Sequence, residues 1–130
     1  MLQERERSVR VVLLGLPLEI AETLNHIVSQ WGAVLYIPPL FPILQSLGLI
    51  EDAGADLVFV WTGAEVGPSL LDLVRKAQPQ IPAVAVNFHT KSTEALDALD
   101  SGAIDYCTPP FDLTHIQWLL QGARHGQYSC

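Results

Sequence analysis

The stretch Ala55 to Thr62, which reads ADLVFVWT, decides the fold. Its centre, Leu57 to Val60, is a short run of aliphatic, β-branched and aromatic residues that follows Asp56 and precedes a glycine at position 63. A continuous apolar run of this length between turn residues is typical of a strand buried on both faces. Such strands belong to parallel sheets covered by helices, so we predict the central strand of an α/β domain. The residue that this strand brings to the carboxyl edge of the sheet, where such domains bind their ligands, is Trp61.

Strand and helix patterns alternate along the rest of the chain. Apolar runs predict further strands at residues 10–14, 33–37, 81–88 and 103–107. Helical spacing predicts helices at residues 18–30, 40–48, 69–77, 92–100 and 112–123, with a short extra turn at 49–53. Gly32 is expected to stop the first helix. The residues expected on the buried faces of the first and last helices are Leu18, Ala21, Leu24, Ile27, Val28, Leu113, Ile116, Leu119 and Leu120. The strict alternation implies a parallel sheet with helices on both faces.

Composition restricts the class of protein. The chain has 130 residues, 49% of them hydrophobic and 16% charged, which fits one globular domain. We expect a flexible leader at residues 1–8, the domain at 9–124 and a flexible tail at 125–130. The formal net charge of −7 and the scattered basic residues argue against nucleic-acid binding. There is no apolar run long enough to span a bilayer and no signal-peptide pattern, so we expect a cytoplasmic protein without a membrane partner.

The segment at residues 81–116, IPAVAVNFHTKSTEALDALDSGAIDYCTPPFDLTHI, resembles the receiver domain of bacterial response regulators. The matching residues are Ser101, Gly102, Ala103, Asp105, Tyr106, Thr108, Pro110, Phe111 and Asp112. The resemblance extends over residues 10–124, with ADLVFVW at the place of the family's third strand. It implies a CheY-like, flavodoxin-like fold: a three-layer, doubly wound sandwich of five helices and a five-stranded parallel sheet in the order 2-1-3-4-5. It also implies a role in two-component signal transduction.

The phosphotransfer residues of that family are absent from the matching positions. The acidic pair that holds Mg²⁺ corresponds to Gly15 and Leu16, and the phosphoacceptor aspartate corresponds to Trp61. The family's hydroxyl residue corresponds to Asn87, which can still donate a hydrogen bond, and its lysine corresponds to Pro109. None of these side chains supplies a metal-binding carboxylate or a nucleophilic oxygen. We therefore expect a pseudo-receiver that is not an enzyme, has no catalytic residue and binds neither a metal nor a cofactor.

Several candidate residues surround this degenerate site. Trp61 is expected to fill the former pocket, with exposure to a ligand as the alternative. Tyr106 takes the place of the family's switch aromatic and is expected to keep one rotamer, because no phosphoryl group biases its rotation. Pro110 takes the place of the family's frequently cis proline, and the Pro109-Pro110 pair is expected to form a fixed turn. Cys107 is expected in the strand interior, and no Cys–His or Ser–His–Asp arrangement is indicated.

Two functions remain open. The first is a protein-interaction or dimerisation module that acts without phosphorylation, with a protein partner or a second copy as its ligand. The residues that the resemblance places on its interface are Glu94, Asp97, Asp105, Ile116 and Trp118. Trp118 either anchors this interface or packs at the margin of the sheet. The alternative function is sensing of a neutral small molecule in a pocket of Trp61, Asn87 and His89. If the chain is a fragment, an output domain is expected beyond it.

Overall fold

A five-stranded parallel sheet forms the middle layer of the computed structural model, which describes residues 9–39, 42–62, 70–88, 99–100 and 102–124. Its strands are β1 (Val9–Leu14), β2 (Gly32–Ile37), β3 (Leu57–Trp61), β4 (Ala83–Val86) and β5 (Asp105–Cys107). The strand order is β2-β1-β3-β4-β5, which confirms the predicted topology.

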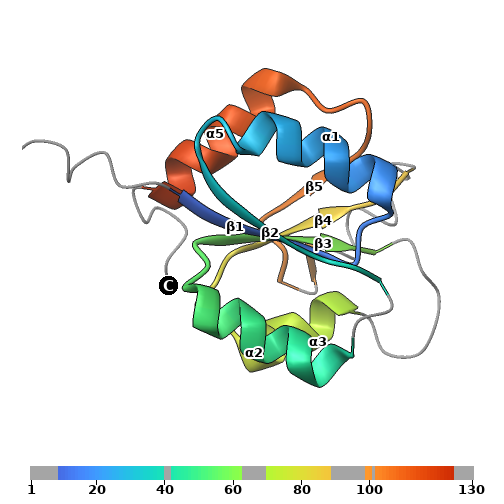
Figure 1. Cartoon of the computed structure of the whole chain (residues 1–130), viewed down its shortest axis with the longest axis vertical. Coiled ribbons are helices and arrows are strands. Elements are labelled where there is room, and N and C mark those ends of the chain that lie inside the picture. The colour runs from blue at the N-terminus through green and yellow to red at the C-terminus, as the bar shows by residue number, and fades with distance from the viewer. Residues whose placement is uncertain (1–8, 40–41, 63–69, 89–98, 101, 125–130) are drawn as a thin grey trace, which may run out of the picture.

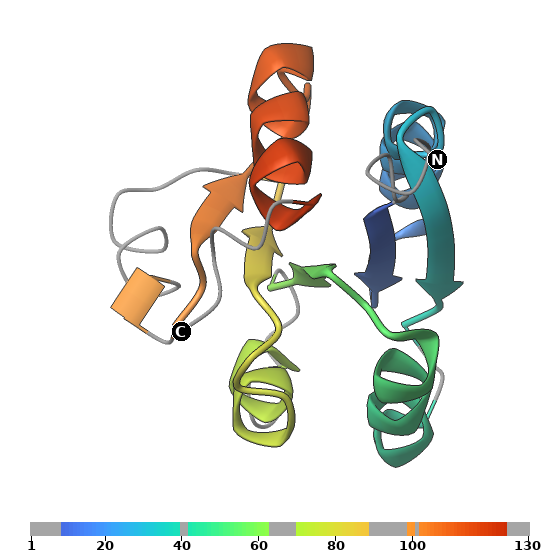
Figure 2. The same ribbon diagram turned by 90° about the vertical axis from the view of Figure 1, so that its left-hand side faces the viewer.

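Helices cover both faces of this sheet. α1 (Leu18–Val28) and α5 (Leu113–Arg124) lie on one face, and α2 (Ile43–Ala53) and α3 (Leu70–Ala77) lie on the other (Figures 1 and 2). The described residues contain these four helices, where the sequence predicted five. The expected helix at 92–100 falls almost entirely outside the described residues, and only its last two positions, Leu99 and Asp100, are described as helical.

The central strand is the middle of the core, as predicted. All four residues from Leu57 to Val60 have no exposed surface. Leu57 and Phe59 join the apolar cluster under α1 and α5, whereas Val58 and Val60 join the cluster over α2 and α3. This two-sided burial explains the continuous apolar run, because strand side chains alternate between two faces that are both dry. Each such side chain contributes roughly 1.5–3 kcal/mol by leaving water.

Some predicted boundaries were wrong. α2 is one helix that begins after Pro42, not two pieces, and it ends at Gly54, whose φ of 64° is readily adopted by glycine. α1 ends at Val28, and Gly32 opens β2 instead of stopping the helix. A Cβ atom at Gly32 would lie 1.9 Å from the carbonyl oxygen of Val9, so this close approach of two strands requires glycine.

Two residues expected in the core are exposed. Leu18 is 60% exposed and Leu113 is 51% exposed. Each is the first residue of its helix, at the edge of the sheet, before the helix crosses the face of the sheet. The strands at 81–88 and 103–107 are also shorter than predicted, because β4 and β5 pair only over the residues given above. The expected leader and tail, at residues 1–8 and 125–130, lie outside the described residues. Among the helices of the described part of the chain, none has the length and hydrophobicity needed to cross a membrane.

Candidate functional site

Apolar groups fill the carboxyl edge of the sheet beside β1. Gly15 follows β1 with a φ of 73°, and its N–H donates to the carbonyl oxygen of Ile37 at 2.8 Å. A Cβ atom built at Gly15 would lie 2.9 Å from the Leu70 side chain and 3.8 Å from Cβ of Trp61. The next residue, Leu16, is fully buried. The space where a side chain at position 15 would begin is therefore already occupied by apolar atoms.

Trp61 ends β3 at this same edge. It is half-buried and packs against the apolar cluster that underlies α1 and α5. Its ring meets the ring of Phe88 edge to face, with centroids 5.1 Å apart and an interplanar angle of 83°. An edge-to-face pair at this separation is the favourable geometry for two aromatic rings. Trp61 and Phe88 thus form one aromatic unit across the ends of β3 and β4, and Phe88 remains 50% exposed.

Asn87 follows β4, and its polar groups are engaged locally. Its backbone N–H donates to the carbonyl oxygen of Cys107 at 3.2 Å. Its side-chain Oδ1 accepts the backbone N–H of Phe88 at 2.6 Å. The hydroxyl of Thr108 donates to the carbonyl oxygen of Phe88 at 2.7 Å and ties the ends of β4 and β5 together. His89, the third expected member of a ligand pocket, lies outside the described residues.

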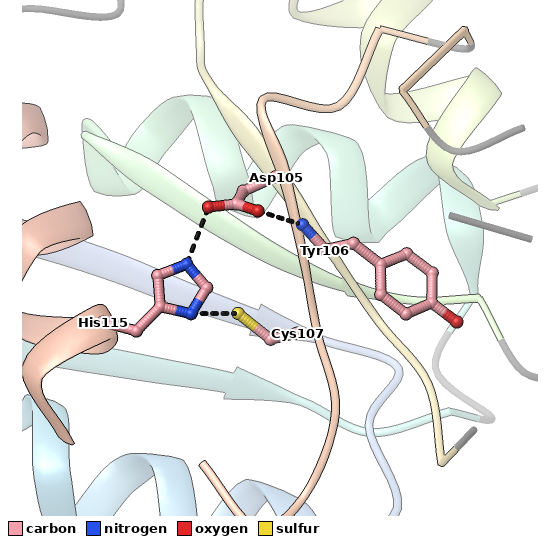
Figure 3. A network of polar contacts seen from close by, with 4 residues as sticks. All are labelled: Asp105, Tyr106, Cys107 and His115. Atoms are coloured by element: carbon pink, nitrogen blue, oxygen red, sulfur yellow. Dashed lines mark hydrogen bonds and ion pairs between the residues drawn. The ribbon is translucent and has the colours of Figure 1, made fainter. Parts of the chain in front are cut away.

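β5 separates two environments. Tyr106 packs against the cluster that contains the α2 and α3 residues, while Asp105 and Cys107 project to the opposite side of the strand, toward α5 (Figure 3). Beyond the strand, the Pro109-Pro110 peptide bond is cis, Pro109 is half-buried and Pro110 is exposed. Cys107 is 4% exposed and lies inside the strand, as predicted.

The sequence indicated no Cys–His arrangement, but the structure brings Cys107 and His115 into contact. His115 of α5 places Nε2 2.7 Å from Oδ2 of Asp105 and Nδ1 4.0 Å from Sγ of Cys107 (Figure 3). Oδ1 of Asp105 also accepts the backbone N–H of Tyr106 at 2.8 Å. A hydrogen on Nε2 lets His115 donate to the Asp105 carboxylate, and Nδ1 then faces the thiol of Cys107.

This arrangement does not activate the thiol. Burial, and then the neighbouring Asp105 carboxylate, raise the pKa of Cys107 to about 12. A nucleophilic cysteine needs the opposite environment, one that stabilises the thiolate. Asp105, Cys107 and His115 therefore form a structural link between β5 and α5. Alternation along the strand puts residues 105 and 107 on one face, but their meeting with His115 depends on how α5 packs, which the sequence pattern does not specify.

The same overall fold occurs in solved receiver structures. No model of a protein family matches the sequence. The receiver domain of NtrX from Brucella abortus superimposes with a TM-score of 0.73 over 88% of this chain and 98% of that domain, at 23% identity. The fold is that of a receiver domain. A CheY-like protein (tadZ) from Pseudomonas aeruginosa gives a TM-score of 0.74 over 89% of this chain and 99% of that chain, at 18% identity.

A known protein is also similar to this chain in sequence. A putative NtrX-like response regulator from Rickettsia typhi is 30% identical over 83 residues, which cover 61% of this chain and 18% of that protein. The chain thus spans less than a fifth of the length of this relative. It likewise covers 27% of a longer NtrX chain from Brucella abortus solved in complex with ADP, at 22% identity and a TM-score of 0.75.

On this receiver fold, one residue of the expected interface, Ile116, is buried, whereas Trp118 is exposed. Ile116 is fully buried in the core and offers no interface surface, because its place on α5 faces the sheet. Trp118 is 57% exposed, and its ring centroid lies 6.5 Å from that of His115. Glu94 and Asp97 lie outside the described residues. Of the expected interface, Asp105 and Trp118 therefore remain.

Within the described ranges, no three carboxylate, imidazole or thiol groups are placed to hold a metal ion. A hollow of about 170 Å³ that described residues line lies beside the first residues of β1 and β2. Sequence reasoning missed Phe88, although an aromatic residue at the end of the strand predicted at 81–88 is the signal that could have identified it.

Proposed function

We propose that the chain is a response-regulator receiver domain of two-component signalling that works without phosphorylation, as a protein-interaction module. The observation that carries this proposal is Trp61, half-buried at the end of β3 and packed on Phe88. In receiver domains, the residue at this position accepts the phosphoryl group. An indole ring has no oxygen that can attack phosphorus, so phosphotransfer has no acceptor at this position.

The groups around Trp61 support the same proposal. Phosphotransfer of this kind needs oxygen ligands that bring Mg²⁺ to the phosphoryl group. Gly15 and Leu16 supply no side-chain oxygen, and a side chain added at Gly15 would collide with Leu70. Asn87 already uses its side-chain oxygen for the N–H of Phe88. We infer a domain that has a binding surface but no phosphorylation site to control it.

The surface that we assign to a protein partner lies on β5 and α5. Trp118 exposes 57% of its area there, and exposed tryptophans are frequent anchors of protein interfaces. The hydrogen bond between His115 and Asp105 joins α5 to β5 one helical turn before Trp118. This bond fixes the helix that carries the tryptophan, so the surface is preorganised for binding.

Incubation with Mg²⁺ and acetyl phosphate tests the first half of the proposal. The intact mass should stay unchanged, and so should the mass in solution measured by light scattering. A covalent phosphoryl adduct would refute the proposal, because some acidic residue would then replace the missing aspartate.

Capture from cells of the source organism tests the second half. The wild-type chain should retain a partner that Trp118→Ala loses. Leu18→Ala is the matched control, because Leu18 is equally exposed, at 60%, but lies on α1. Equal loss of the partner in both variants would contradict a specific surface at Trp118.

A further inference from the structure

A long part of the chain carries no formal charge. No Asp, Glu, Lys or Arg occurs between Glu22 and Glu51, although the chain contains 14 acidic and 7 basic residues. This interval includes all of β2 and most of α2. The two elements lie together at one edge of the molecule, opposite the edge formed by β5 (Figure 2). In a chain with a net charge of −7, β2 and residues 43–50 of α2 thus carry no charged side chain, and the first acidic residues of α2 are Glu51 and Asp52 at its end.

The outer edge of β2 is open in the described part of the chain. β2 pairs with β1 over six residues, from Val9↔Gly32 to Leu14↔Ile37, and it is the last strand of the sheet on that side. Natural edge strands are usually short, or they carry a proline or charged residues such as lysine that prevent pairing with another strand. β5 at the opposite edge has three residues and begins with Asp105. β2 has six residues, GAVLYI, and none of these protections within the strand.

Apolar surface lies beside this open edge. The hollow of about 170 Å³ is lined by Val12, Leu35 and Ala53, among others, between the sheet and the end of α2. Ala33 in β2 is exposed, and Val34, Leu35 and Tyr36 are half-buried. On α2, Leu44 is 80% exposed and Leu49 is 37% exposed. We refer to β2 and residues 43–50 of α2 together as the β2–α2 edge.

We propose that the β2–α2 edge binds a second copy of this chain, with the two β2 strands antiparallel across a two-fold axis. The distribution of charged residues favours a second copy as the binding partner. Two copies with a charge of −7 each repel one another on most approaches, and contact through an uncharged margin keeps their acidic residues apart. β2 and residues 43–50 of α2 offer no charged side chain that a different protein could recognise by electrostatic complementarity. The nearest charged residues, Arg10, Glu51 and Asp52, lie beside the hollow and at the end of α2. Antiparallel pairing of identical strands is self-complementary, as a two-fold interface requires.

The helix must contribute to such an interface. Stable dimers bury roughly 1,200 Å² or more in total, which is more than a six-residue strand edge provides by itself. The exposed Leu44 and Leu49 of α2 are the apolar surface available to supply the remainder. This surface is separate from Trp118, so the inference does not depend on the function proposed above.

Sedimentation or light scattering across a range of protein concentrations tests the inference. We expect a monomer–dimer equilibrium that added salt strengthens, because salt screens the repulsion between two acidic copies. Ala33→Lys and Leu44→Lys should each raise the dissociation constant of the dimer by about tenfold or more. Each substitution places two added charges in the interface, because the two-fold axis repeats the residue in both copies. Leu18→Lys is the control: Leu18 is 60% exposed but lies on α1, and this variant should dimerise like the wild type. Trp118→Lys probes the separate surface on β5 and α5.

Hydrogen exchange provides a second measurement that needs no variant. Backbone amides of residues 32–37 should exchange more slowly as the concentration of the wild-type chain rises. A chain that stays monomeric at every concentration would overturn the inference. A dimer that Trp118→Lys abolishes and Ala33→Lys leaves intact would also overturn it, while leaving the proposed role of the β5–α5 surface standing.

Discussion

Cys107 should react with iodoacetamide about a thousandfold more slowly in the folded chain than a free cysteine does. The variant Cys130→Ser isolates this thiol, because the chain contains only these two cysteines. The physical basis is the pKa of Cys107, which burial and the Asp105 carboxylate raise from 9.0 to about 12. Only the thiolate reacts, so its fraction sets the rate.

The magnitude follows from these two pKa values. At pH 8 a thiol with a pKa of 9.0 is about one-tenth ionised, whereas one with a pKa of about 12 is about one ten-thousandth ionised. The ratio is about a thousand, and burial of the sulfur, which is 4% exposed, slows access further. The contact with the neighbouring His115 is long, because its Nδ1 lies 4.0 Å from the sulfur.

The assay is alkylation at pH 8 followed by intact mass. The chain unfolded in urea serves as the internal standard, because its Cys107 should react like a free cysteine. His115→Ala should leave the slow rate low. Alkylation of the folded chain within about tenfold of the unfolded rate would refute the reasoning, because Cys107 would then be an ionised and accessible nucleophile. The Asp105–His115–Cys107 arrangement would in that case need to be considered as a catalytic site.

Two further predictions concern stability. The thiol ionises at a lower pH in the unfolded chain than in the folded one, so the free energy of unfolding should fall by about 1.4 kcal/mol between pH 7 and pH 10 on account of Cys107. Urea unfolding at both pH values should show that Cys107→Ala removes this pH-dependent loss of stability. An equal loss in the variant would contradict the assignment to Cys107. Some loss at alkaline pH should remain from Tyr36, because burial also raises the pKa of its phenol. Separately, Gly15→Ala should lower the free energy of unfolding by about 1–2 kcal/mol, because φ is 73° there and the new Cβ would meet Leu70. Thermal unfolding measures this change. Gly48→Ala is the control, because a Cβ atom at Gly48 would meet open space. An unaltered midpoint in Gly15→Ala would contradict the packing described for Gly15.

The topology could be predicted from the sequence because each strand and helix has a local pattern. The run LVFV of β3 has to be dry on both faces, and that requirement by itself places it between two layers of helices. Errors arose where one residue type fits two environments. Gly32 fits the pattern of a helix stop, but its lack of a side chain allows the carbonyl oxygen of Val9 to approach closely. Leu18 and Leu113 fit a helical stripe but stand at the first position of their helices.

The candidate site was predictable in part. The alignment of Gly15, Trp61, Asn87 and β5 at one edge follows from strand order. The bond between His115 and Asp105 does not, because it joins a strand to a helix whose rotation depends on packing of the whole layer. The helical pattern did place Ile116 on the buried face of α5, which its assignment to an interface overlooked. Residues two positions apart on a helix differ by about 200° in direction, and this rotation separates a buried Ile116 from an exposed Trp118.

The packing of Gly15 against Leu70 and Trp61 has a consequence for how this domain can evolve. A carboxylate placed at position 15 by mutation would first collide with Leu70, and an aspartate in place of Trp61 would first remove a ring that packs on Phe88. Each single step toward a metal-binding, phosphate-accepting edge therefore costs stability before it supplies any chemistry. Selection would have to change several residues together, so the packing of these side chains opposes the gain of the carboxylates that phosphotransfer needs at this edge.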